Sequence, residues 1–133
     1  MAVTPIYAGI LAIMFFVLSV RVVAVRSRVS LGDGGDPVVL RRMRGHANFS
    51  EYVPLILLMM GLLELSRFSA YFLHAAGITL VFARLIHGYA LSFTEKFKFG
   101  RFWGTTLTFI LLLAVGGTCL YQGIVGVTAM GIR

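Results

Sequence analysis

The stretch RGHANFSEYVP at positions 44–54 gathers polar side chains that could bind a charged ligand. Residues three or four apart lie on the same face of a helix, so a helix here would align Arg44, Asn48, Glu51 and Tyr52 in one polar column. In such a column the arginine could bind a carboxylate, the glutamate an ammonium group and the asparagine an amide. The spacing therefore predicts a pocket for a small ligand with several charged groups.

The same column also allows a purely structural interpretation. Ionisable groups inside an apolar segment are costly, so they usually face a bundle interior or a wet cavity and are paired. An Arg–Glu network that only fixes helix packing is therefore an equal alternative to the pocket. Arg41 falls in the same sector of the helix. Pro54 removes a backbone hydrogen bond to the carbonyl of Ser50, which predicts a kink beside the column.

A second group of polar residues lies in the sequence ARLIHGYALSFTEKFKFGRFWG. Arg84, His87 and Tyr89 come at the end of one apolar run, and Lys98 and Arg101 open the next. A cation at a helix N-terminus opposes the helix dipole. Its presence there favours a purpose such as stabilising an anion, and ordinary anchoring at the membrane surface is the alternative.

The composition indicates a membrane protein. Of the 133 residues, 59% are hydrophobic and 13% are charged, whereas a soluble domain has about a quarter of its residues charged. The net charge is +7, but the basic residues cluster at the ends of apolar runs, where they meet anionic head groups. We therefore expect no nucleic-acid partner. We also expect no metal, since His46, His74 and His87 lack the spacing of metal ligands.

The elements that must position these residues are four apolar segments. Each is long enough to span a bilayer, which takes about 20 helical residues. Four segments cannot close a barrel, so each must be a helix. The sequence therefore predicts an all-α fold, one integral membrane four-helix bundle filling residues 1–133. The expected helices are 5–26, 37–65, 68–91 and 101–127.

The distribution of basic residues predicts the orientation of this bundle. The links after the first and third helices, together with the helix ends beside them, carry Arg26, Arg28, Arg41, Arg42, Arg44, Lys96, Lys98 and Arg101. The other side carries only Arg67 and Arg133. Because basic loops stay in the cytoplasm, we expect both termini outside and the polar clusters at the cytoplasmic face.

With these residues in place, the sequence resembles the MAPEG family, membrane-associated proteins in eicosanoid and glutathione metabolism. The segments VSLGDGG, RRMRGHANFSEYVPLILLMMGLLEL, ARLIHGYA and GRFWGTTLT carry the resemblance, which covers nearly the whole chain and is strongest to small bacterial members. The most specific motif is R-x-H-A-N-x-x-E-Y-x-P. The resemblance implies a homotrimer in the cell membrane that binds glutathione between protomers, near the cytosolic face, for detoxification.

The resemblance also implies roles for individual residues. The glutathione site would comprise Arg26, Arg44, His46, Asn48, Glu51, Tyr52, His87 and Tyr89. Arg21 is the alternative to Arg26 as the arginine of the first helix. The cation that stabilises the glutathione thiolate would be Arg101 by the R-x-x-G pattern, or Lys98 by counting without gaps from Arg84.

The implied chemistry is activation of a bound thiol. A free thiol has a pKa of about 8.5 and is mostly protonated at neutral pH. Lowering that pKa by two units takes about 2.7 kcal/mol, which a cation in a partly dry site can supply. We therefore expect a glutathione transferase that conjugates lipophilic electrophiles arriving through the bilayer, with reduction of lipid hydroperoxides as a second use of the thiolate.

Two other functions compete with this expectation. A non-catalytic membrane protein on the same fold could bind a lipid or a partner, and would need neither Arg101 nor turnover. A small four-helix multidrug exporter would need a carboxylate in its first helix, and PIYAGILAIMFFVLSV contains none. The exporter is therefore disfavoured, and the binding protein remains as the alternative.

Overall fold

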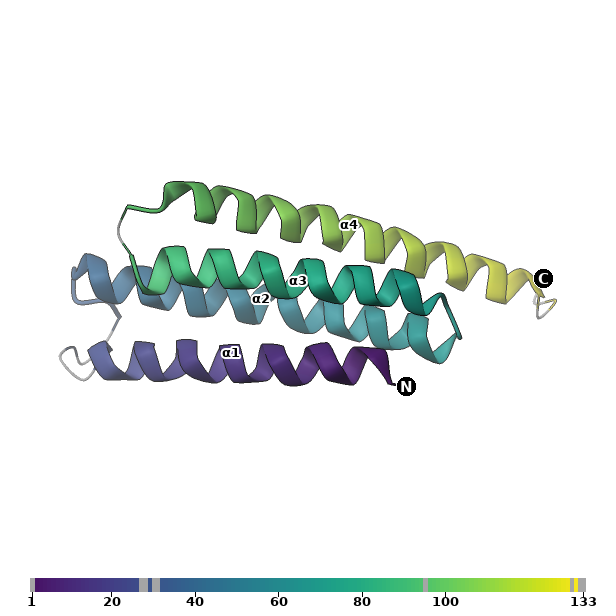
Figure 1. The fold of residues 1–133 in the computed structure, drawn as a ribbon, viewed down its shortest axis with the longest axis horizontal. Helices are drawn as coiled ribbons and strands as arrows, with labels where there is room; N and C mark the ends of the chain where they lie inside the picture. The colour runs from purple at the N-terminus through teal and green to yellow at the C-terminus, as the bar shows by residue number, and fades with distance from the viewer. Residues whose placement is uncertain (1, 27–28, 30–31, 95, 130, 132–133) are drawn as a thin grey trace.

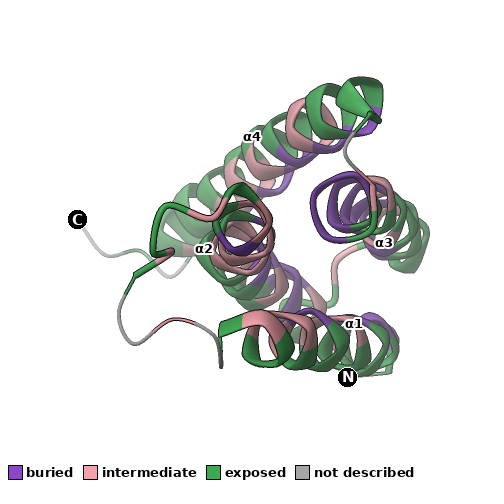
Figure 2. Cartoon of the chain, turned by 90° about the vertical axis from the view of Figure 1, so that its left-hand side faces the viewer, coloured by how far each residue is buried: buried purple, intermediate pink, exposed green. Residues whose placement is uncertain are grey.

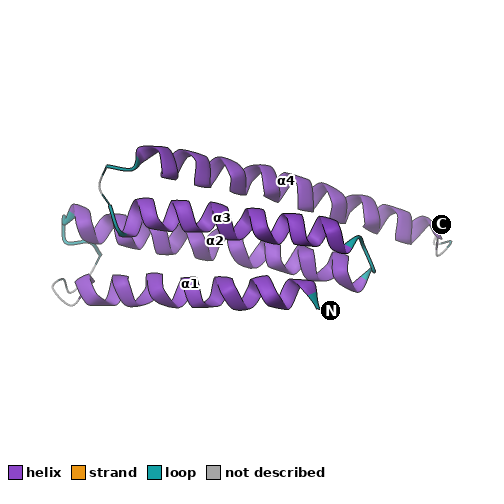
Figure 3. Cartoon of the chain, viewed as in Figure 1, coloured by secondary structure: helices purple, strands orange, loops and turns teal. Residues whose placement is uncertain are grey.

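The computed structural model describes residues 2–26, 29, 32–94, 96–129 and 131. These residues form helices and short links without a strand (Figure 3). The all-α prediction is confirmed, and all four helices are long and apolar enough to cross a membrane. They run antiparallel to their neighbours along the chain (Figure 1). Their bounds are α1 Val3–Arg26, α2 Pro37–Leu65, α3 Ala70–Ser92 and α4 Lys98–Ala129.

The helix ends differ by a few residues from those expected. α3 begins at Ala70 rather than at position 68, because the preceding link contains Arg67 with a left-handed φ of 56°. α4 begins at Lys98 rather than at 101, so both Lys98 and Arg101 lie in its first turns. α1 begins at Val3, two residues before the expected start.

α2 begins with an aspartate cap. The Asp36 side chain accepts hydrogen bonds from the backbone N–H groups of Val38 at 2.7 Å and Val39 at 3.4 Å, and Pro37 follows it as the first helical residue. A proline suits that position because it has no N–H to satisfy. The helix then continues through Pro54 without interruption.

The bundle has α2 and α3 at its centre and α1 and α4 on opposite sides of them (Figure 2). Buried apolar side chains from α1, α2, α3 and the middle of α4 form the core, including Leu11, Ile56, Met60, Leu80 and Val115. The last part of α4 extends past the other helices (Figure 1). Its side chains are mostly exposed and apolar, which suits contact with lipid.

α4 packs tightly on α3 along a stripe of small residues. Gly100, Gly104 and Thr108 follow one another at intervals of four and are all buried. A β-carbon on Gly104 would lie 2.6 Å from Cβ of His87 and 2.8 Å from the carbonyl oxygen of Ala83. Small residues let two helix backbones approach this closely, and the stripe fixes the position of the first turns of α4.

Candidate functional site

A cavity of about 760 Å³ opens between α2, α3 and α4. It lies at the end of the bundle that carries the α1–α2 and α3–α4 links, here called the basic end. Its volume falls within the range of small-molecule sites, about 300–1,000 Å³. We call it the main cavity; its lining is Arg44, Ala47, Asn48, Glu51, His87, Leu91, Lys98, Arg101, Phe102, Thr105, Thr106 and Phe109.

Four charged side chains line the main cavity. α2 contributes Arg44 and Glu51, one helical repeat of seven residues apart, and α4 contributes Lys98 and Arg101 from its first turns. All four are exposed. Among the residues that the structure describes, none of the four has a hydrogen-bond or ion-pair partner. The Arg–Glu packing network is therefore not found in that part of the chain, and three cations and one carboxylate are free to meet a ligand.

Asn48 lies on the same wall, and a buried arginine holds its side chain. Arg84 is only 1% exposed, and its Nη1 donates to Oδ1 of Asn48 at 2.7 Å. Its Nη2 donates to the carbonyl oxygen of Gly104 at 3.1 Å and to the hydroxyl of Thr108. All these partners are neutral. Arg84 does not line the main cavity, although the sequence places it among the polar residues at the end of α3.

His87 forms part of the cavity wall on α3. It is 5% exposed, and Gly104 of α4 packs directly against its β-carbon. The small-residue stripe of α4 thus sets the distance between this histidine and the cations Lys98 and Arg101. His87 and the two cations of α4 thus lie on two helices whose separation is fixed.

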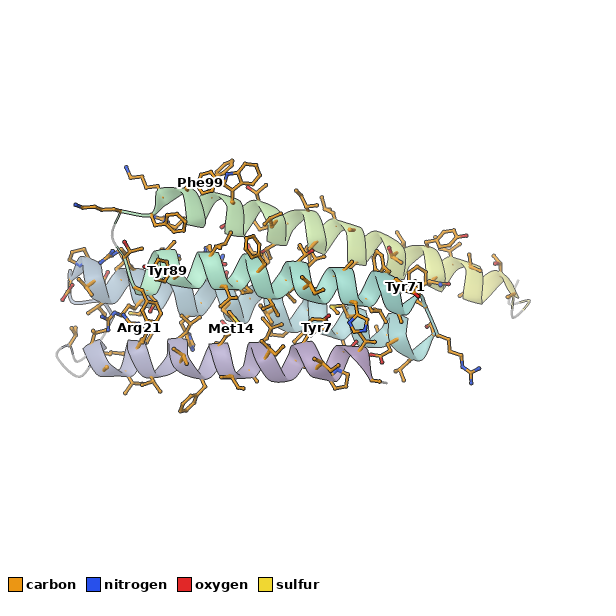
Figure 4. All side chains as sticks on the ribbon, viewed as in Figure 1. Tyr7, Met14, Arg21, Tyr71, Tyr89 and Phe99 are labelled. Carbon is orange, nitrogen blue, oxygen red and sulfur yellow. The ribbon has the colours of Figure 1, made fainter. Side chains whose placement is uncertain are left out.

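Three other predicted site residues lie outside the main cavity. His46 faces α1, where its ring stacks on Phe15 at 4.6 Å and Nε2 lies 3.1 Å from the hydroxyl of Ser19. Arg26 is exposed at the end of α1. Tyr89 lines a separate groove of about 260 Å³ between α1 and α3, together with Met14 (Figure 4).

Tyr52 lies behind the cavity wall rather than on it. Its ring packs edge-to-face against Phe109, with ring centroids 5.4 Å apart, and Phe109 lines the cavity. Of the ten predicted site residues, the structure therefore brings six to one cavity. These are Arg44, Asn48, Glu51, His87, Lys98 and Arg101.

Arginines nearer the end of the bundle tie helix ends together. Arg21 donates to the hydroxyl and the carbonyl of Ser92, and its guanidinium lies 3.7 Å from the ring centroid of Phe93. Arg41 donates to the carbonyl oxygen of Thr94 at 3.1 Å. Arg41 shares the sector of Arg44 on the helix, but it lies one turn further out, where the α3–α4 link covers it.

Some lining residues were not anticipated from the sequence. Phe102, Thr105, Thr106 and Phe109 of α4 form the less polar side of the main cavity. The signal that could have found them is the spacing of Gly100, Gly104 and Thr108, which marks the face of α4 that packs on α3. Among the described residues, no three His, Cys, Asp or Glu side chains lie together in a way that could hold a metal ion.

Comparison with known proteins identifies relatives of the chain. A model of the MAPEG family matches residues 4–121 of the chain. The chain is 34% identical over 89 residues to the inner membrane protein YecN of Escherichia coli K12, a match that covers 65% of this chain and 68% of YecN. YecN of Escherichia coli O6:H1 matches with the same identity and coverage. No solved structure matches the chain.

Proposed function

Because the chain belongs to the MAPEG family, we propose that it is a membrane glutathione transferase. It binds glutathione in the main cavity, stabilises the thiolate, and conjugates it to lipophilic electrophiles that enter from the bilayer. The same thiolate can also reduce lipid hydroperoxides. Detoxification is the role that this chemistry serves.

The observation that carries the proposal is the set of four charged side chains in the main cavity that have no partner among the described residues. Glutathione has carboxylates at both ends, one ammonium group, two peptide bonds and a thiol. Arg44 and the cations of α4 can bind its carboxylates, and Glu51 can bind its ammonium group. The excess of cations over carboxylates in the lining also favours a ligand with net negative charge.

Thiol activation needs a cation beside the sulfur. Arg101 is our first candidate and Lys98 our second, and both line the cavity from the first turns of α4. When glutathione binds, the cysteinyl proton leaves to solvent and the remaining negative charge faces the cation. The thiolate then attacks the electrophile, and no covalent intermediate with the protein is required.

The electrophile reaches the cavity from its lipid side. Phe102 and Phe109 line that side and are exposed, as is expected of residues that meet lipid. A lipophilic substrate dissolved in the bilayer can therefore approach the thiolate without crossing water. Access of this kind selects substrates by solubility in lipid more than by hydrogen bonding.

We propose that the protein functions as a homotrimer. Arg26, His46 and Tyr89 lie away from the main cavity of their own chain, so they can contact glutathione only from a neighbouring copy. We also propose that it resides in the bacterial inner membrane, like YecN, with both termini outside. The basic end, and the cavity with it, would then face the cytoplasm, where glutathione is available.

An assay with purified protein separates this proposal from the alternative of a non-catalytic lipid- or partner-binding protein. The protein in detergent is mixed with glutathione and chlorodinitrobenzene, and conjugate formation is followed by its absorbance. Saturable turnover supports the transferase. Binding of glutathione by calorimetry without turnover of this or other lipophilic electrophiles would favour a binding protein, and no binding would contradict the glutathione site.

A further inference from the structure

The side chain of Arg84 determines which hydrogen-bonding group of Asn48 faces the ligand. An arginine has only donors, so the atom of Asn48 that meets Arg84 must be its carbonyl oxygen. The two atoms lie 2.7 Å apart. The amide nitrogen of Asn48 must then point the other way, and Asn48 lines the main cavity.

The rest of the Arg84 environment holds this arrangement in place. Arg84 is buried, and its second terminal nitrogen is fixed by the carbonyl of Gly104 and the hydroxyl of Thr108. That hydroxyl in turn donates to the carbonyl of Gly104 at 2.7 Å. The guanidinium thus has one position, set by α4, from which its Nη1 reaches across to α2.

The nitrogen of the Asn48 amide has no such constraint. Among the described residues it has no hydrogen-bond partner, and it is not one of the buried side-chain atoms without a partner. It is therefore not fully buried, and Asn48 lines the main cavity. An accessible and unused N–H donor beside Arg44 and Glu51 is available to a ligand.

We propose that Arg84 is a positioning residue that presents Asn48 as a hydrogen-bond donor, so that Asn48 selects a ligand with a carbonyl or carboxylate oxygen at this point. The inference rests on the proposed function and names one group of the ligand it requires. In glutathione that group is a peptide carbonyl or a terminal carboxylate. A ligand with a hydrogen-bond donor at this point would face the two N–H groups of the Asn48 side-chain amide, find no acceptor, and bind poorly.

The proposal can be tested by replacing the amide nitrogen of Asn48 with an oxygen, because the positive charge of Arg84 can accommodate a carboxylate. In Asn48→Asp, one carboxylate oxygen still accepts from Arg84, and the buried guanidinium gains a partner of opposite charge. The oxygen facing the cavity becomes an anionic acceptor in place of a donor. We expect thermal stability to be kept or raised, and affinity for glutathione to fall by about tenfold or more, as for a lost charged hydrogen bond.

Nuclear magnetic resonance gives a direct view of the orientation. Asn48 is the only asparagine in the sequence, so protein labelled on asparagine side chains shows a single pair of side-chain amide resonances, here called the amide pair. The chemical shifts of this pair should change on addition of glutathione. In Arg84→Met, which removes every donor to Asn48, the pair should move and its response to glutathione should weaken.

Further variants test the role of Arg84. Thr108→Val removes one of the two groups that fix Arg84 and should shift the amide pair in the same direction as Arg84→Met, but by less. In Asn48→Ala, adding Arg84→Met should cause no further loss of affinity, because Arg84 acts through Asn48. An amide pair that is the same in Arg84→Met and the wild type, or full glutathione affinity in Asn48→Asp, would overturn the proposal.

The two proposals can fail separately. If the wild type binds no glutathione, the proposed function fails, and the position of the amide pair in Arg84→Met still tests the orientation. If Arg84→Met does not fold, Asn48→Asp and Thr108→Val keep Arg84 and still test it. Glutathione binding that is indifferent to Asn48→Asp would leave the proposed function standing and remove Arg84 from it.

Discussion

Gly104 of α4 and His87 of α3 touch so closely that a methyl group on the glycine would lie 2.6 Å from Cβ of the histidine. The same methyl would lie 2.8 Å from the backbone oxygen of Ala83. Neither neighbour is the end of a flexible chain, so the helices themselves would have to separate. This contact therefore sets one dimension of the main cavity, the distance between His87 on α3 and the cations Lys98 and Arg101 on α4.

Gly104→Ala should consequently widen the cavity and weaken glutathione binding. We expect overpacking to lower the free energy of unfolding by about 1–3 kcal/mol. The better helix propensity of alanine should offset about 1 kcal/mol of this loss. Thermal unfolding in detergent and calorimetric titration measure the two effects. Gly117→Ala is the matched control, because a β-carbon there meets nothing within 4 Å; equal effects of both changes would contradict the packing argument.

Arg44→Ala and Glu51→Ala should each weaken glutathione binding. Both side chains line the main cavity without a described partner, and a hydrogen bond to a charged group contributes about 1.5–3 kcal/mol, or roughly ten- to a hundredfold in affinity. Calorimetric titration of the purified variants measures the change.

Arg41→Ala is the control for these two variants. Arg41 carries the same charge in the same sector of α2, but its guanidinium donates to the carbonyl of Thr94 and does not line the main cavity. We expect much less loss of affinity than in Arg44→Ala. Equal losses would mean that only the overall positive charge matters, and unchanged affinity in both Arg44→Ala and Glu51→Ala would remove these residues from the site.

Arg67→Gly should stabilise the protein without affecting the site. Arg67 lies two residues past the end of α2 and has a φ of 56°. Its N–H donates to the carbonyl of Glu64, and the N–H of Phe68 donates to the carbonyl of Leu63. This pattern is a Schellman motif, whose left-handed position favours glycine. We expect a gain of about 1 kcal/mol, close to the penalty for a left-handed residue with a side chain.

Arg67→Ala separates the backbone effect from the charge. It removes the same positive charge but keeps a β-carbon at the left-handed position. The midpoint of thermal unfolding should therefore rise in Arg67→Gly and not in Arg67→Ala. A rise of the same size in both variants would assign the effect to the charge.

Glu64→Gln should destabilise the bundle at the end opposite the main cavity. The Glu64 carboxylate accepts hydrogen bonds from the backbone N–H groups at the start of α1, from Val3 and Thr4 at 2.8 Å each and from Ala2. A neutral amide has one acceptor oxygen for these donors and no negative charge to interact favourably with the positive end of the helix dipole. We expect the free energy of unfolding to fall by about 1–2 kcal/mol.

Glutathione affinity is the control for this change. Because Glu64 lies at the other end of α2 from Arg44 and Asn48, binding should remain as in the wild type while the midpoint of thermal unfolding falls. A large loss of affinity in Glu64→Gln would show that the two ends of the bundle are coupled. No loss of stability would show that the cap contributes little in the folded protein.

The helices were predictable from the sequence because each contains a long apolar run. Asp36 before Pro37 marks the start of α2, and the glycines of the preceding link allow tight turns. The start of α3 was less clear, since nothing in the amino-acid sequence shows that Arg67 adopts a left-handed conformation. Local sequence signals of this kind predict that a helix is present but do not determine its terminal residues.

The candidate site was predictable in part, for a physical reason. Helical spacing places Arg44, Asn48 and Glu51 on one face, and the structure has all three on the main cavity. Spacing within α2 does not show which neighbour each residue meets. His46 therefore faces α1, Arg41 meets the α3–α4 link, and the support of Asn48 by Arg84 across 36 positions of sequence could be seen only in the folded chain.

The central claim is that this protein turns bound glutathione into a thiolate. The most direct measurement is an ultraviolet difference titration of the detergent-purified protein with glutathione at neutral pH, repeated with Arg101→Ala and Lys98→Ala. We predict a saturable thiolate absorbance in the wild type that is lost in Arg101→Ala and largely kept in Lys98→Ala. Glutathione that binds without thiolate absorbance, or a thiolate signal that survives in both variants, would contradict the claim that a cation of α4 activates the thiol.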